Sequence, residues 1–140
     1  MSFETDDEIE ATARAMMACA LPKAAWTHAA HFAAALWLLR ERGDAAARAE
    51  MPGLIRRYNE SVGGRNTDSE GYHETITQAS LHMAARALRD APLHVVLAEL
   101  LAGPCGKPDW IFAYWSRGVL MSPEARRAWI APDLAPLPAG

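Results

Sequence analysis

Apolar residues recur along most of this chain at the three- and four-residue spacing of an amphipathic α-helix. Clusters of β-branched and aromatic residues that alternate with polar ones, which would indicate strands, are missing. Alanine, leucine and arginine, all strong helix formers, dominate the sequence. We therefore expect an all-α protein, a single-domain bundle of about six to seven helices over residues 1–130. Residues 131–140 carry three prolines and should form an extended tail.

Turn and cap residues set the expected limits of the helices. The predicted ranges are about 6–20, 27–42, 44–59, 72–90, 93–102, 109–116 and 123–130. The third is expected to be interrupted at Met51-Pro52, because proline disfavours the helical conformation in the residue before it. Ser122-Pro123 predicts a helix start, with serine as the N-cap and proline in the first turn. The longest stretch of turn-forming residues covers 61–71.

Composition and charge exclude several classes of function. The formal net charge is −3 and the basic residues form only isolated pairs, so we expect no nucleic-acid partner. No apolar run is long enough to cross a membrane, and the acidic start does not resemble a signal peptide. Cys19 and Cys105 match no zinc or redox spacing, which favours reduced thiols and a cytoplasmic location.

Three histidines occupy the beginnings of predicted apolar helices. His28 and His31 fall in the first turn of the second helix, and His73 heads the fourth. An imidazole removed from water needs a partner, because leaving it unpaired costs a few kcal/mol. Histidines three apart on a helix can present two nitrogens to one ion, and the helix dipole keeps them neutral there. We expect the three rings to converge on one pocket and to bind a divalent metal such as zinc, iron or nickel.

Other polar residues could complete such a site. Glu74 is a candidate catalytic base or fourth ligand, although it lies about 100° around the helix from His73. The remaining candidates for binding a substrate or anion are Arg65, Asn66, Tyr72, Ser116 and Arg126. Structural interpretations compete with each of these: hydrogen-bonded core histidines, a carboxylate that complements the helix dipole, and turn-forming loop residues.

Three motifs connect the chain to known proteins. They are 26–31 with its paired histidines, Tyr72-His73-Glu74-Thr75-Ile76-Thr77, and a C-terminal set formed by Tyr114-Trp115-Ser116, Leu120-Met121-Ser122, Ala125-Arg126, Trp129 and Pro132-Asp133-Leu134-Ala135-Pro136-Leu137-Pro138. In this combination the chain resembles a family of small, largely uncharacterised bacterial helical proteins. The resemblance implies that the three motifs belong to one architecture, and it attaches no activity to them.

Two classes of function follow from the sequence. In the first, the histidines hold a metal in a pocket that binds or hydrolyses a small substrate. In the second there is no metal: two helix starts and their histidines bind a small anion or metabolite, or the protein is an interaction module. Whether it is an enzyme stays open, since the second helix lacks the glutamate of a His-Glu-x-x-His motif. Exposed tryptophan and methionine would favour a homodimer.

Overall fold

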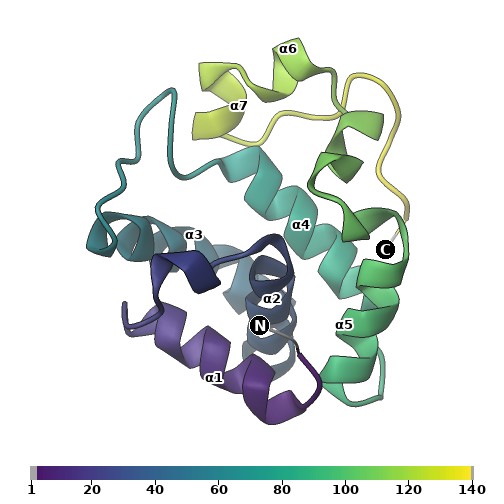
Figure 1. Cartoon of the computed structure of the whole chain (residues 1–140). Helices are drawn as coiled ribbons and strands as arrows, with labels where there is room; N and C mark the ends of the chain where they lie inside the picture. The colour runs from purple at the N-terminus through teal and green to yellow at the C-terminus, as the bar shows by residue number, and fades with distance from the viewer. Residues whose placement is uncertain (1–2, 140) are drawn as a thin grey trace.

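Helices make up all the regular structure in residues 3–139, which are the residues that the computed structural model describes (Figure 1). The predicted all-α class is therefore confirmed. The elements, in chain order, are α1 (Asp6–Met17), η1 (Lys23–Ala25), α2 (His28–Arg42), α3 (Asp44–Ser61), α4 (Glu74–Ala87), α5 (Leu93–Ala102), η2 (Pro104–Gly106), η3 (Pro108–Ala113), α6 (Arg117–Leu120) and α7 (Pro123–Arg127), where η denotes a 3₁₀ helix.

Helix α2 is the central element of the bundle. Thr27 caps it, accepting a hydrogen bond from the Ala30 amide, and every residue from Phe32 to Leu39 is buried. It packs against α1, α3, α4 and α5, so it has no face left for solvent along this stretch. This follows from the sequence, because a helix with no charged residue through its middle is stable only when it is surrounded by protein.

Helix α3 corrects one expectation from the sequence. It runs without a break from Asp44 to Ser61, with Pro52 inside it. Proline has no amide hydrogen, so the carbonyl of Arg48 lacks its usual donor four residues on. The Gln78 side chain on α4 supplies that donor at 3.2 Å. A residue 30 positions away in the chain thus offsets the hydrogen bond that proline cannot make.

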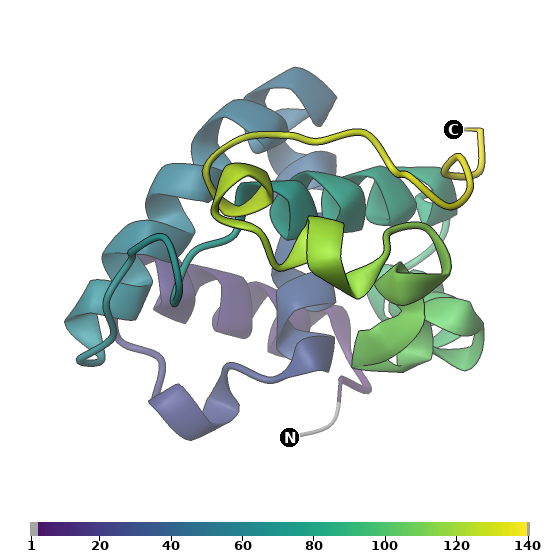
Figure 2. The same cartoon turned by 90° about the horizontal axis from the view of Figure 1, so that it is seen from above.

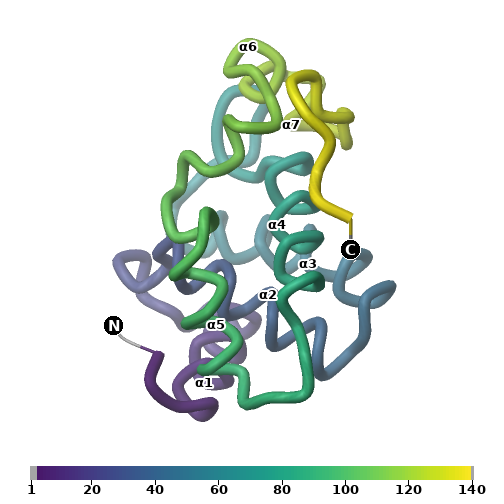
Figure 3. Tube along the Cα trace, turned by 90° about the vertical axis from the view of Figure 1, so that its right-hand side faces the viewer, coloured from purple at the N-terminus to yellow at the C-terminus, as the bar shows by residue number. Residues whose placement is uncertain are grey.

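The C-terminal third of the chain covers one end of α4 (Figure 2). Residues expected to form an α-helix at 109–116 form the 3₁₀ helix η3 instead, and the four-residue α6 was not predicted at all. Ser122 caps α7 as predicted, accepting from the Ala125 amide. Residues 128–139 contain no helix and run back along α4 (Figure 3), where His82 Nε2 donates to the carbonyl of Pro138.

None of the helices within residues 3–139 is long and apolar enough to span a lipid bilayer. Cys19 and Cys105 are both free thiols.

Candidate functional site

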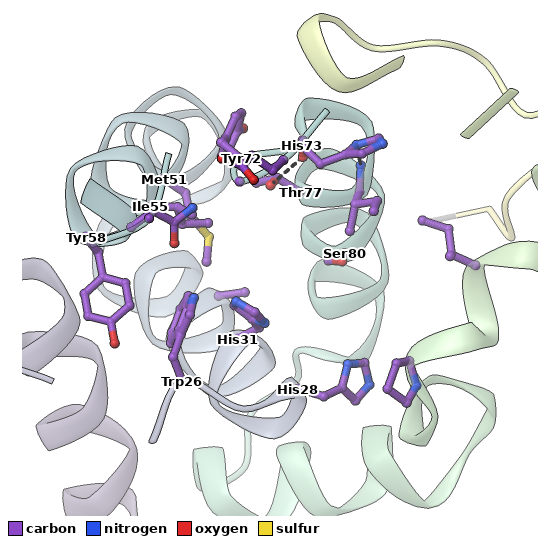
Figure 4. A pocket seen from close by; sticks show the side chains of 18 of the residues that line it. Trp26, His28, His31, Met51, Ile55, Tyr58, Tyr72, His73, Thr77 and Ser80 are labelled. Carbon is purple, nitrogen blue, oxygen red and sulfur yellow. Dashed lines mark hydrogen bonds between the residues drawn. The ribbon is translucent and has the colours of Figure 1, made fainter. Parts of the chain in front are cut away.

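A cavity of about 940 Å³ lies between α2, α3 and α4 and is bordered on the remaining side by η3 and α6. The loop between α3 and α4 forms part of its rim. His28, His31 and His73 all line this cavity, although they come from two separate stretches of the chain (Figure 4). The structure therefore brings the three histidines to one pocket.

The cavity wall is mostly apolar. Its buried lining side chains include Phe32, Ile55, Leu81, Ile111 and Leu120. Aromatic rings close the side next to α3, where Trp26 meets Tyr58 edge to face with centroids 5.4 Å apart. On such a wall the few polar groups determine how a ligand is oriented, because most neighbouring side chains can form no hydrogen bonds.

His73 has no free ring nitrogen. It is the N-cap of α4: its Nδ1 accepts from the Ile76 amide at 3.1 Å, which leaves the proton on Nε2. Nε2 donates that proton to the carbonyl of Leu120 at 2.6 Å. Burial lowers the pKa of this ring, so the neutral form that makes both bonds is favoured. We interpret His73 as a structural residue that fixes the start of α4 against α6.

His28 uses one of its two nitrogens. Its Nε2 lies 2.7 Å from the carbonyl of Cys105, and since a carbonyl only accepts, the proton is on Nε2. In the neutral ring, Nδ1 is then an acceptor, and it makes no hydrogen bond to another residue in the part of the chain described. The ring also packs edge to face on Phe32, with centroids 5.3 Å apart.

His31 is the free imidazole of the site. Neither of its nitrogens hydrogen-bonds to another residue among 3–139, and the ring is exposed to the cavity. Trp26 packs edge to face against it at 3.9 Å between centroids. Many protein atoms lie near the ring, although the side chain itself is exposed. This desolvation, with a smaller contribution from His28, lowers the pKa of His31 to about 4. His31 is therefore neutral near pH 7.

The described residues contain no cluster of three or more histidine, cysteine, aspartate or glutamate side chains able to hold a metal ion. The hydrogen bonds of His73 explain why it does not join the other two histidines as a ligand, because both of its nitrogens are occupied. Only His28 and His31 keep an available lone pair. Metal binding by the three histidines gains no support from this arrangement and stays a prediction.

Glu74, the expected catalytic base, does not line the histidine cavity. It borders a separate hollow of about 540 Å³ between α4 and residues 129–137. Its carboxylate accepts a hydrogen bond from the Tyr72 hydroxyl and another from Gln78. The helical rotation between positions 73 and 74 directs the two side chains to different sides of α4. Glu74 is thus separated from the histidines it was expected to serve.

Of the five predicted binding residues, the cavity is lined by Arg65 and Tyr72. Asn66 instead organises the loop before α4. Its side-chain oxygen Oδ1 accepts a hydrogen bond from the Tyr72 amide at 2.9 Å. Ser116 is the N-cap of α6. Arg126 donates to the carbonyl of Gly71 at 2.9 Å and so ties the same loop to α7. These three residues shape the site from outside it.

Ser80 and Arg117 are two of the lining residues that the sequence did not identify as site residues. Ser80 faces the cavity from α4 (Figure 4) and makes no side-chain hydrogen bond to another described residue. It lies seven positions after His73, on the same helical stripe, which is a signal that could have identified it. Arg117 also lines the cavity. It opens α6, and since no pattern predicted α6, nothing in the sequence pointed to Arg117.

No model of a known protein family matches this chain, and searches of curated proteins and of solved structures found no match. The resemblance to small bacterial helical proteins therefore stays a prediction. The chemistry of the cavity is the remaining basis for assigning a function.

Proposed function

We propose that this protein binds a small organic molecule in the histidine-lined cavity, with His31 as its main hydrogen-bonding partner. The cavity volume of about 940 Å³ falls in the range of small-molecule sites. A mainly apolar wall with a few polar groups from different helices is also typical of such sites. This function corresponds to metabolite binding without a metal, which the sequence left open as the alternative to metal binding.

The observation that carries the proposal is the state of His31. The imidazoles of the cavity differ in whether the protein already uses their nitrogens, and a nitrogen bonded to the backbone is not available to a ligand. His28 and His73 are bonded to the carbonyls of Cys105 and Leu120. His31 has no such partner among the described residues and is directed into an apolar cavity. Both nitrogens of this exposed ring are therefore open to a polar group of a ligand in the cavity.

Binding is better supported than acid–base catalysis. A general base works best when its pKa lies near the working pH, and His31 has a pKa of about 4. The carboxylate expected to assist, Glu74, lies outside the cavity. A neutral imidazole nevertheless recognises ligands well, because one nitrogen donates a hydrogen bond while the other accepts one.

A neutral fluorescent probe, N-phenyl-1-naphthylamine, tests the proposal. It has an apolar body and one N–H group that can donate to His31. We expect saturable binding of one probe per chain, seen as enhanced probe fluorescence. His31→Ala should weaken the affinity about fivefold, which corresponds to one neutral hydrogen bond. Ala35→Trp, which places a large side chain on the buried cavity wall, should abolish binding.

His82→Ala is the matched control, because His82 lies on α4 but faces the other hollow. It should leave the probe affinity unchanged. Absence of saturable binding, or equal affinity in the wild-type and Ala35→Trp proteins, would exclude this cavity as the binding site. Circular dichroism of each variant distinguishes a filled cavity from an unfolded chain.

A further inference from the structure

The arginines of this protein fall into two groups, those whose side chain has a polar protein partner and those without one. Eight of the twelve arginines donate a hydrogen bond to a carboxylate or a backbone carbonyl, and a ninth, Arg127, forms an ion pair with Asp68. Within residues 3–139, the three that make no such bond are Arg56, Arg65 and Arg117. Arg65 and Arg117 line the cavity directly, and Arg56 contacts Tyr72, which lines it. Two of the three guanidinium groups without a polar partner therefore border this cavity, and the third lies against one of its wall residues.

Two of these arginines are held in position by aromatic rings of the cavity wall. The Arg117 guanidinium carbon lies 4.4 Å from the centroid of the Phe112 ring, and that of Arg56 lies 4.6 Å from the centroid of Tyr72. Cation–π contact of this kind orients a guanidinium without using its N–H donors. The donors at the edge of each group stay available. Because Arg117 is exposed and lines the cavity, its donors lie at the cavity opening rather than in the interior.

The charges around the cavity opening do not balance. Lys23 also lines the cavity and forms no ion pair among the described residues, whereas Glu70 is the single acidic residue in the described lining. Like charges near one another repel unless a counter-ion is present, and together they attract anions. The interior carries no compensating charge, since His31 is neutral near pH 7.

From the excess of basic side chains in the lining we infer that the ligand is a carboxylic acid with a mainly apolar body: the body lies against the buried wall, where a polar group on it can bond His31, and the carboxylate lies at the opening, where Arg65 and Arg117 are the candidate partners. The inference rests on the proposed function and narrows it to one class of ligand. Arginine suits this role because its planar guanidinium can donate two parallel hydrogen bonds to a carboxylate. Exposed arginines alone would simply be hydrated; their position around an apolar cavity is what favours an amphiphilic acid over a free inorganic anion.

A pair of probes that differ only in charge tests the inference: 2-naphthoate and the neutral 2-naphthamide. By isothermal titration calorimetry at low salt, we expect naphthoate to bind about tenfold more tightly. Added salt should reduce this difference, since exposed charges are screened. Arg117→Gln and Arg65→Gln should each weaken naphthoate binding about threefold or more and leave naphthamide unaffected.

Arg89→Gln provides the matched control. It removes the same charge from an arginine that is paired with Glu99 and does not line the cavity, so it should leave both affinities unchanged. Equal affinity for the two probes, or an equal loss in the Arg89 variant, would overturn the carboxylate inference while leaving the proposed binding site intact. Failure of both probes to bind would overturn the inference and the proposed function together.

Discussion

The three histidines of the cavity differ in how many of their ring nitrogens are hydrogen-bonded to protein. His73 uses both ring nitrogens, His28 uses one, and His31 uses neither within the described chain. The sequence places each of them at the start of a helix and does not distinguish their roles further. Their hydrogen-bond partners distinguish these roles, because a histidine whose nitrogens are occupied by backbone groups is unavailable to a ligand or metal.

The pKa of His31 leads to a prediction about pH. Desolvation lowers this pKa from its ordinary value of 6.5 to about 4, so between these values the unfolded chain takes up a proton that the folded chain excludes. The contribution of His31 to folding is therefore complete above pH 6.5 and is lost as the pH falls towards 4. We expect the free energy of unfolding, measured by urea denaturation, to fall more steeply over this range in wild type than in His31→Asn.

His73 also has a lowered pKa, but it is present in both proteins, so the difference between their pH profiles isolates His31. Parallel profiles for the two proteins would contradict the low pKa of His31.

At the scale of elements, a side chain on one helix can satisfy a backbone hydrogen-bonding group of another. Pro52 would ordinarily end or weaken α3, and Gln78 on α4 compensates by donating to the Arg48 carbonyl. The loop before α4 depends on similar support. Gly71 has a φ of +82°, and a Cβ there would lie 1.9 Å from the carbonyl oxygen of Arg65, so only glycine fits. Neither arrangement is visible to an analysis of local sequence.

A double-mutant cycle tests the link between α3 and α4. Gln78→Ala should reduce the free energy of unfolding by about 1 kcal/mol, because the Arg48 carbonyl loses its donor. Pro52→Ala introduces a backbone amide that can donate to that carbonyl, so removing Gln78 should cost less in this background. The hydrogen bond from Gln78 to Glu74 is lost in both backgrounds and cancels. Urea denaturation of the four proteins measures the coupling, and strictly additive effects would argue against the compensation.

At the scale of the whole molecule, the C-terminal segment, residues 128–139, packs over α4 on the side of the second hollow. Thr75 is fully buried and makes two hydrogen bonds to this segment: its hydroxyl donates to the Ala128 carbonyl at 2.9 Å and accepts from the Ile130 amide at 3.1 Å. The indole of Trp115, also fully buried, donates to the Ile130 carbonyl at 2.8 Å. Residues 128 and 130 are therefore attached to the bundle, while the extended form expected for residues 131–140 stays a prediction.

Removing the Thr75 hydroxyl should loosen this attachment. Thr75→Val keeps the shape of the side chain but leaves a carbonyl and an amide without their partner, which should cost about 1–3 kcal/mol. Amide hydrogen exchange should become faster in residues 128–139. Thr75→Ser keeps the hydroxyl, so exchange in the segment should stay close to that of wild type. Unchanged exchange in the valine variant would show that other contacts hold the segment.

Large apolar side chains stay exposed near this end of the molecule. Met121 and Trp129 are each 45% exposed and Leu134 is 58% exposed. Such residues are common on single-chain proteins and do not by themselves indicate a partner. Homodimer formation accordingly stays a prediction.

The sequence by itself determined the helical class, the central position of α2 and the caps Thr27 and Ser122. These features depend on the spacing of apolar residues and on side chains next to the helix start, and both are written within a few neighbouring positions. It also indicated that the histidines belong to one site.

Only the tertiary structure decided what each histidine can do. The carbonyls that occupy His28 and His73 lie 77 and 47 positions away in the chain, and Arg117 reaches the cavity from a helix without a local signal. Availability of a ring nitrogen depends on which distant backbone groups pack beside it, and packing at that range is not encoded in any local pattern.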